Sequence, residues 1–406
     1  MGLDTPPGLA VDGLLDDPGT RIIVCCGAGG VGKTTTAAAL GVRAAGRGRK
    51  AVVLTIDPAR RLAQSMGIDS LDNTPRKVAG VGADGGELHA MMLDMKRTFD
   101  EIVEAHADGE RAQAILANPF YQSLSAGFAG TQEYMAMEKL GQLRARDDWD
   151  LIIVDTPPSR SALDFLDAPK RLGSFLDGRF IRVLMAPAKV GGRAGMKFLN
   201  VGMSMMTGTL SKLMGASLLK DVQTFVAAMD TMFGGFRTRA DATFRLLQAP
   251  GTAFLVVAAP EPDALREAAY FVERLAAESM PLAGLVLNRV HGSGADQLSA
   301  ERALAAAENL EEGGIVDQES GKAGLRDADS DTDDTTEVDA ITAGLLRLHA
   351  ERMQVIAREK RTRDRFTSLH PEVAVAEVAA LPGDVHDLAG LRAIGERLAT
   401  GVPAGA

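Results

Sequence analysis

The sequence is poor in cysteine, which limits the chemistry open to it. Only two of its 406 residues are cysteines, Cys25 and Cys26, and they are neighbours in one apolar run. Successive side chains on a strand point to opposite faces, so this pair is badly placed to form a disulfide or to share a metal ion. We therefore predict no disulfide framework and no zinc site, and we expect a reducing, cytoplasmic environment.

The sequence also lacks long hydrophobic runs. No stretch of about 18 apolar residues occurs, so we predict no membrane-spanning helix. The first residues have neither a basic start nor an apolar core, which argues against a signal peptide. We expect at most peripheral association with a membrane.

The sequence also has fewer basic than acidic residues, 44 Lys and Arg against 54 Asp and Glu. The formal net charge is −10, and no basic stripe offsets it. An acidic chain of this kind is not expected to have nucleic acid as its main partner. The run "RDADSDTDDTTEVD", residues 326–339, holds seven acidic residues and one arginine, and is typical of a solvated, disordered loop.

What the sequence does contain is a series of short apolar runs separated by helical patterns. The runs begin at Arg21, Ala51, Leu151, Ala253, Ala283 and Val373. Apolar runs of this length read as buried parallel strands, and their alternation with helices predicts an α/β fold with a doubly wound, mostly parallel sheet. Ligands of such sheets bind at the carboxyl ends of the strands.

A phosphate-binding motif follows the first run. The stretch "GAGGVGKT", Gly27 to Thr34, matches the loop G-x-x-x-x-G-K-[ST], in which backbone N–H groups and a helix N-terminus surround phosphate. We expect Lys33 to reach the β- and γ-phosphates, Thr34 to offer its hydroxyl to Mg²⁺, and Thr35 to lie near the α-phosphate. The predicted nucleotide-binding residues of this segment are Gly27, Gly29, Gly30, Val31, Gly32, Lys33, Thr34 and Thr35.

Three further polar residues end predicted strands. Asp57, in "LTIDPARRL", is placed to orient an attacking water, although Asp-Pro is also a good helix start. Asp155, in "WDLIIVDTPPS", is expected to hold Mg²⁺ through a water, and the two prolines after it predict a stiff switch segment. Asn288, in "LVLNRV", can donate and accept hydrogen bonds at an adenine edge, or can be a turn asparagine.

These motifs divide the chain into predicted units. The expected units are a flexible tail over 1–20; a P-loop ATPase core over 21–94, 131–165, 251–310 and 341–406; an inserted α-helical subdomain over 95–130 and 166–250; and an acidic disordered loop over 311–340. Between Met185 and Met232 the subdomain holds eight of the 17 methionines. Flexible methionines suit an apolar groove for a client, but the same residues can simply pack the core of the subdomain.

In this order, the motifs resemble the family of arsenical-pump ATPases and tail-anchored-protein targeting factors. The resemblance is carried by "GAGGVGKTT", "TIDPARRL", "VDTPP", "AAPEP", "LNRV" and "LPGDVHDLAGLRAIGERL". It implies a Mg²⁺-dependent ATPase that binds ATP and ADP, with Asp57 and Lys33 in catalysis. It also implies nucleotide contacts from Glu261 and Asn288, and from a loop around Pro382 and Asp384.

The sequence departs from this family in its cysteines. The arsenical pump holds its metalloid with several dispersed cysteines, and this chain has only Cys25 and Cys26. Arsenite transport is therefore not expected. Targeting factors use a CxxC pair to bind zinc where two subunits meet, and no CxxC occurs here, so no zinc is predicted.

A second departure is Ala28. Family members carry a lysine there that reaches the nucleotide of the partner subunit, and alanine cannot supply this charge. The chain can pair with a related ATPase that keeps the lysine, it can form a slow homodimer, or Arg60 or Arg61 can substitute. Losing such a cation typically costs orders of magnitude in rate.

The expected function is a dimeric ATP-hydrolysing switch that couples its nucleotide state to a hydrophobic client or a membrane partner. The alternative is a weakly catalytic or regulatory nucleotide-binding subunit in a heterodimer with a lysine-bearing relative. A partition-type or septum-placement ATPase is less favoured, because the short C-terminal segment resembles a packing helix.

Overall fold

The computed structural model centres on an eight-stranded sheet with the order β3-β4-β2-β5-β1-β6-β7-β8. It describes residues 7–57, 61–82, 85–119, 121–122, 125, 131–157, 238–319 and 332–400. All neighbouring strands pair in parallel, except β3 and β4, which are antiparallel. The prediction of an α/β fold with a doubly wound, mostly parallel sheet is confirmed.

The strands account for the six predicted apolar runs and add two more. They are β1 Ile22–Cys26, β2 Lys50–Thr55, β3 Arg76–Lys77, β4 Glu87–Met92, β5 Leu151–Asp155, β6 Thr252–Ala258, β7 Leu282–Val290 and β8 Val375–Ala379. β4 was not predicted, because Glu87 and His89 interrupt its apolar residues and its burial alternates. β3 is two residues long and exposed.

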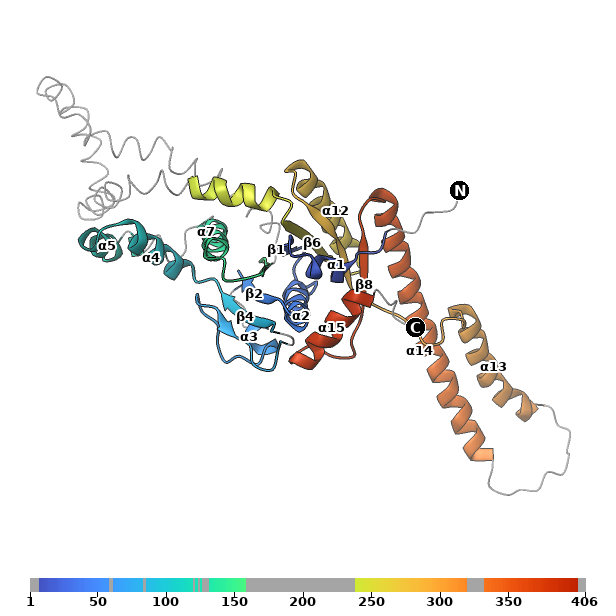
Figure 1. Ribbon diagram of the computed structural model, residues 1–406. Helices are drawn as coiled ribbons and strands as arrows, with labels where there is room; N and C mark the ends of the chain where they lie inside the picture. The colour runs from blue at the N-terminus through green and yellow to red at the C-terminus, as the bar shows by residue number, and fades with distance from the viewer. Residues whose placement is uncertain are drawn as a thin grey trace, which may run out of the picture.

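Helices cover both faces of the sheet (Figure 1). They are α1 Val11–Asp16, α2 Lys33–Gly46, α3 Arg61–Ser65, α4 Met95–His106, α5 Gly109–Leu116, α7 Thr131–Arg146, α12 Pro262–Ala277, α13 Ala300–Glu319, α14 Thr332–Leu369 and α15 Leu388–Thr400. Residues 238–248 are also helical. Cys25 belongs to the core that includes α2 and α15, and Cys26 to the core that includes α7 and α12. The two thiols thus point to opposite faces, as predicted.

Residues 7–20 are not the flexible tail that the sequence predicted. The side chains of Val11 and Leu15 in α1 are fully buried. The guanidinium of Arg49 donates hydrogen bonds to the carbonyl oxygens of Leu15, Asp17 and Thr20 at 2.8–3.0 Å. The sequence interpretation missed this short helix because polar residues surround its two buried apolar side chains.

The acidic loop that the sequence predicted over 311–340 is helical at both of its described ends, and residues 320–331 lie outside the described residues. α13 continues to Glu319, and α14 begins at Thr332. The two helices form a long hairpin that projects from the β8 side of the sheet (Figure 1). Acidic residues in the first turn of a helix are favoured by its dipole, so this acidic run suits a helix start as well as a loop.

The helical subdomain is described only in part. Its described pieces, α4, α5 and residues 238–248, are helical. Residues 158–237, with the methionine-rich stretch, lie outside the described residues. Within the described ranges, none of the helices combines the length and hydropathy that a membrane span requires.

Candidate phosphate-binding site

The phosphate loop joins β1 to α2 and depends on two glycines with positive φ. Gly27 has φ of 148°, and a Cβ there would lie 2.1 Å from the carbonyl oxygen of Val257. Gly32 has φ of 97°, and a Cβ there would lie 2.2 Å from the side-chain nitrogen of Asn288. Only glycine fits both the backbone and the space.

The N-terminus of α2 is left open for a ligand. Gly32 is its N-cap and has no side chain to accept from the first turn, and no acidic residue occupies that turn. The first N–H groups of a helix need outside partners, and its dipole favours negative charge there. The loop therefore presents donors where phosphate oxygens are expected.

Lys33 lies inside the loop. Its Nζ donates to the carbonyl oxygens of Gly27 at 3.0 Å and Ala28 at 2.6 Å, and the residue is 6% exposed. Burial lowers the pKa of this amine, while the carboxylates of Asp155 and Asp57 act in the opposite sense. A buried ammonium with two carbonyl partners is well placed to exchange them for phosphate oxygens.

Asp155 ends β5 beside the loop and is fully buried. Its Oδ2 accepts from the hydroxyls of Thr34 at 2.7 Å and Thr55 at 2.8 Å. Burial raises the pKa of this carboxyl to about 6. Its other oxygen, Oδ1, is buried and has no hydrogen-bond partner among the residues that the structure describes. A buried carboxylate oxygen without a hydrogen-bond donor destabilises the fold unless a ligand or a water molecule binds to it.

This arrangement fits magnesium. Mg²⁺ prefers oxygen ligands and keeps several of its waters, so one hydroxyl, one carboxylate and substrate phosphates can hold it. Thr34 and Asp155 would be these protein groups, and the bound ion would neutralise phosphate charge. Among the described residues no group of three or more His, Cys, Asp or Glu side chains could hold a metal by itself.

Thr55 is a site residue that the sequence interpretation missed. Besides its bond to Asp155, its hydroxyl accepts from the backbone N–H of Asp57 at 3.2 Å. It thereby ties the two acidic residues to one another. Its position at the end of a buried strand, two residues before Asp57, is the sequence feature that could have indicated a role in the site. Asp57 itself follows β2 and is half-buried.

Asn288, in β7, lies beneath the loop. Its Nδ2 donates to the carbonyl oxygen of Val31 at 2.8 Å, and the residue is 7% exposed. The side chain thus supports the loop from the neighbouring part of the sheet. This contact is new relative to the sequence interpretation, and a role at the adenine edge stays a prediction.

The remaining predicted contacts stand apart from the loop. Glu261 is the exposed N-cap of α12, and Pro382 and Asp384 are exposed in the segment between β8 and α15. No hydrogen bond between described residues joins them to the loop, and their roles stay predictions.

The side chain of Ala28 is 8% exposed and packs with the α2 core. Arg61 begins α3 and is exposed, whereas Arg60 lies outside the described residues.

Several known proteins have sequences similar to this one. ATPase GET3 of Podospora anserina is 26% identical over 299 residues, covering 72% of this chain and 80% of that protein. ATPase GET3 of Malassezia globosa is 30% identical over 167 residues, or 47% of its own length. ATPase BagA of Mycobacterium tuberculosis is 27% identical over 170 residues, so the chain spans 49% of that protein.

A family model described as anion-transporting ATPase matches residues 20–311, a range that includes the phosphate loop, Asp57, Asp155 and Asn288. With its parallel sheet and P-loop, the chain belongs to the anion-transporting ATPase family.

Proposed function

We propose that the chain is a Mg²⁺-dependent ATPase that works as a dimeric switch for a hydrophobic client or a membrane partner. The observation that carries the ATPase part is the juxtaposition of Lys33, Thr34 and Asp155 around an open helix N-terminus. The orphaned Oδ1 of Asp155 supports the metal requirement. Asp57 is the residue that we expect to orient the attacking water.

The coupling part is supported by two hydrogen-bonded links, one from the residue before Asp57 to α7 and one that joins α4 to α7. The first link runs through α7, where the side chain of Gln132 donates to the carbonyl oxygen of Ile56 at 3.0 Å. Ile56 directly precedes Asp57. Movement of the Asp57 segment with nucleotide state would therefore reach α7.

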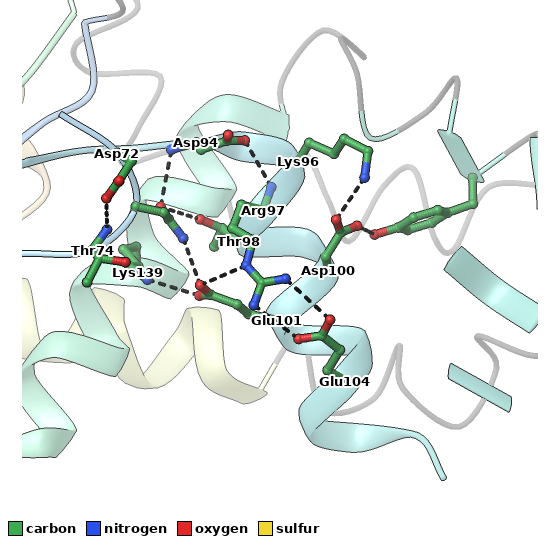
Figure 2. Close-up of polar contacts among 12 residues, drawn as sticks. Asp72, Thr74, Asp94, Lys96, Arg97, Thr98, Asp100, Glu101, Glu104 and Lys139 are labelled. Carbon is green, nitrogen blue, oxygen red and sulfur yellow. Dashed lines mark hydrogen bonds and ion pairs between the residues drawn. The ribbon is translucent and has the colours of Figure 1, made fainter. Parts of the chain in front are cut away.

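The second link is the polar network in Figure 2, which joins the segment after α3 to α4. The Oδ1 of Asn73 accepts from the backbone N–H of Asp94 at 3.1 Å and from the hydroxyl of Thr98 at 3.1 Å. Its Nδ2 donates to Glu101, which also accepts from Lys139 of α7 at 2.9 Å. α4 and α7 thus respond together, which is what a nucleotide-driven switch needs.

The test is binding and hydrolysis of ATP by the purified chain as Mg²⁺ is varied. Lys33→Ala should lower kcat by about 100-fold or more, because it removes a cation from the transferring phosphate. Asp155→Asn should raise the Mg²⁺ concentration needed for half-maximal rate. Lys96→Ala, an exposed ion-pair lysine on α4, is the matched control and should leave both unchanged. Equal activity of Lys33→Ala and the unchanged chain would refute the assignment.

One observation favours the alternative of a regulatory subunit in a heterodimer with a related ATPase. Ala28 stands where the resembling family carries its intersubunit lysine, and its buried methyl group offers no charge to a partner. A chain that binds ATP but hydrolyses it only after a lysine-bearing relative is added would support this reading. Activity of the chain alone, unchanged by Ala28→Lys, would count against it.

A further inference from the structure

The outer face of α14 carries a stripe of exposed apolar side chains. Val338, Ile341, Leu345 and Leu348 are 57–63% exposed, and Val355 is 37% exposed. Their spacing follows the heptad pattern of a coiled-coil seam. The a and d positions from 338 to 355 are apolar except for Arg352, whose Nε donates to the carbonyl oxygen of Gly292 at 2.5 Å. Exposed faces of helices are normally polar, so a stripe of this length indicates a missing partner.

The stripe is not the face that packs on α13. That contact uses the opposite side of α14, where Ala343 and Ala350 are at most 1% exposed. Arg347 pairs with Glu311 of α13 at 2.6 Å, and the ring of His349 hydrogen-bonds the carbonyl oxygen of Leu298 at 2.7 Å. The hairpin is therefore closed on its inner side and leaves the stripe uncovered among the described residues.

Exposed charge along α14 is unevenly distributed. Glu337 and Asp339, near the start of the helix, are exposed. Beyond Arg347, which pairs with α13, the exposed charges are mainly basic: Arg352, Arg358, Lys360, Arg361 and Arg365, with Glu351 and Asp364 as the acids among them. Two parallel copies would bring like charges together, whereas two antiparallel copies would bring each acidic end beside a basic one.

We propose that the stripe pairs with the same stripe of a second copy, with the two α14 helices antiparallel. The heptad register then sets Val338 opposite Val355 of the other copy, Leu345 opposite Leu348, and Ile341 opposite the aliphatic stem of Arg352. The flanking Glu337 lies beside Arg358 of the other copy. Such a pair has twofold symmetry, so every contact is made twice. The stripe residues do not belong to the phosphate site, and this contact does not rest on the proposed ATPase function.

The first test is the mass of the full chain without nucleotide, measured by sedimentation over a range of concentrations. We expect a reversible dimer whose Kd rises by about 100-fold or more in Leu345→Glu/Leu348→Glu, because burial of leucine supplies much of the contact. Tyr270→Glu is the control, since Tyr270 is an exposed apolar residue on α12 with 53% exposure. Circular dichroism should show that all variants keep their helix content.

A charge reversal tests the orientation. Glu337→Arg and Arg358→Glu should each weaken the dimer several-fold, and the double variant should restore it. Cysteine pairing gives a second readout, because the native Cys25 and Cys26 are at most 1% exposed and do not compete. Val338→Cys chains mixed with Val355→Cys chains should form a mixed disulfide under mild oxidation, and neither variant should do so alone.

Three results would overturn the proposal. The first is a monomer at all concentrations in the nucleotide-free state. The second is a dimer that the Leu345→Glu/Leu348→Glu variant leaves unchanged. The third is self-linking of Val338→Cys alone, which would show parallel helices.

Discussion

Gly32 shows how tightly single residues determine the phosphate loop. Its φ of 97° is unfavourable for any residue with a Cβ, and that Cβ would collide with the side chain of Asn288. We predict that Gly32→Ala lowers the free energy of unfolding by roughly 2–4 kcal/mol and abolishes tight nucleotide binding. Chemical denaturation and nucleotide titration measure the two effects.

Gly46, at the other end of the same helix, is the matched control. A Cβ there would meet nothing within 4 Å. Gly46→Ala should leave nucleotide binding unchanged and raise stability by about 0.5–1 kcal/mol. The double variant Gly32→Ala/Asn288→Ala should recover the part of the loss that is due to the collision, but not the backbone strain. A neutral Gly32→Ala would show that the loop is more tolerant than its geometry indicates.

At the scale of single residues, the sequence predicted those positions where a motif requires one particular residue type. The positions of Lys33, Thr34 and Asp155 beside one another could be predicted from the motif and the strand end, and their roles toward a nucleotide stay predictions. Thr55 and the loop contact of Asn288 could not, because each depends on which strands are neighbours. β2 lies beside β5 and β7 beside β6, and no local pattern carries that order.

Among the elements, α1 shows the clearest difference between sequence and structure. Arg49 is 9% exposed and donates to four carbonyl oxygens, those of Leu15, Asp17, Thr20 and Asp150. Removing these bonds leaves buried acceptors without donors. Arg49→Met should therefore lower the free energy of unfolding by about 2–4 kcal/mol. Thermal or chemical denaturation checks this value.

Arg47 supplies the comparison for Arg49. It pairs with Asp16 and Asp12 at the surface, where its side chain is 34% exposed. Exposed pairs contribute about 0–1 kcal/mol, so Arg47→Met should change stability by no more than that. Equal losses in the two variants would mean that residues 7–20 are not held by the buried guanidinium.

The Asn73 network gives a prediction for α4. Asn73 is 4% exposed and makes three hydrogen bonds that link α4 to the segment after α3 (Figure 2). Asn73→Ala should cost about 1–3 kcal/mol, because it leaves buried polar groups unpaired. Hydrogen exchange should speed up in α4 while α2 stays protected. Uniform acceleration throughout the sheet would contradict a local role for this network.

The helix hairpin shows why composition alone predicted a loop over residues 311–340, whose described ends are helical. Seven acidic residues in a short run are typical of a solvated loop, and they masked the heptad spacing that begins at Val338. α14 extends over 38 residues because α13 covers its inner side and because its base contacts α12 and adds Phe366, which is 4% exposed, to the hydrophobic core. That support comes from elements distant in the sequence.

At the scale of the whole molecule, the sheet, the P-loop and the family agree on a nucleotide-driven protein. The fold could be predicted because six of the strands lie in short apolar runs, which can be recognised without knowing their neighbours. The placement of the helices could not, because it depends on which apolar faces meet after folding. α7 is hydrogen-bonded to the carbonyl oxygen of Ile56, which directly precedes Asp57, and α4 is joined to α7 through Glu101 and Lys139.

The most direct test of this account is the steady-state rate of ATP hydrolysis by the purified full chain with Mg²⁺, compared with Lys33→Ala and Asp57→Asn. The account predicts measurable turnover in the unchanged chain, loss of turnover by about 100-fold or more in both variants, and nucleotide binding retained in Asp57→Asn. Turnover that persists in either variant, or tight ATP binding with no turnover in the unchanged chain, would contradict the proposal that this chain is itself the catalyst.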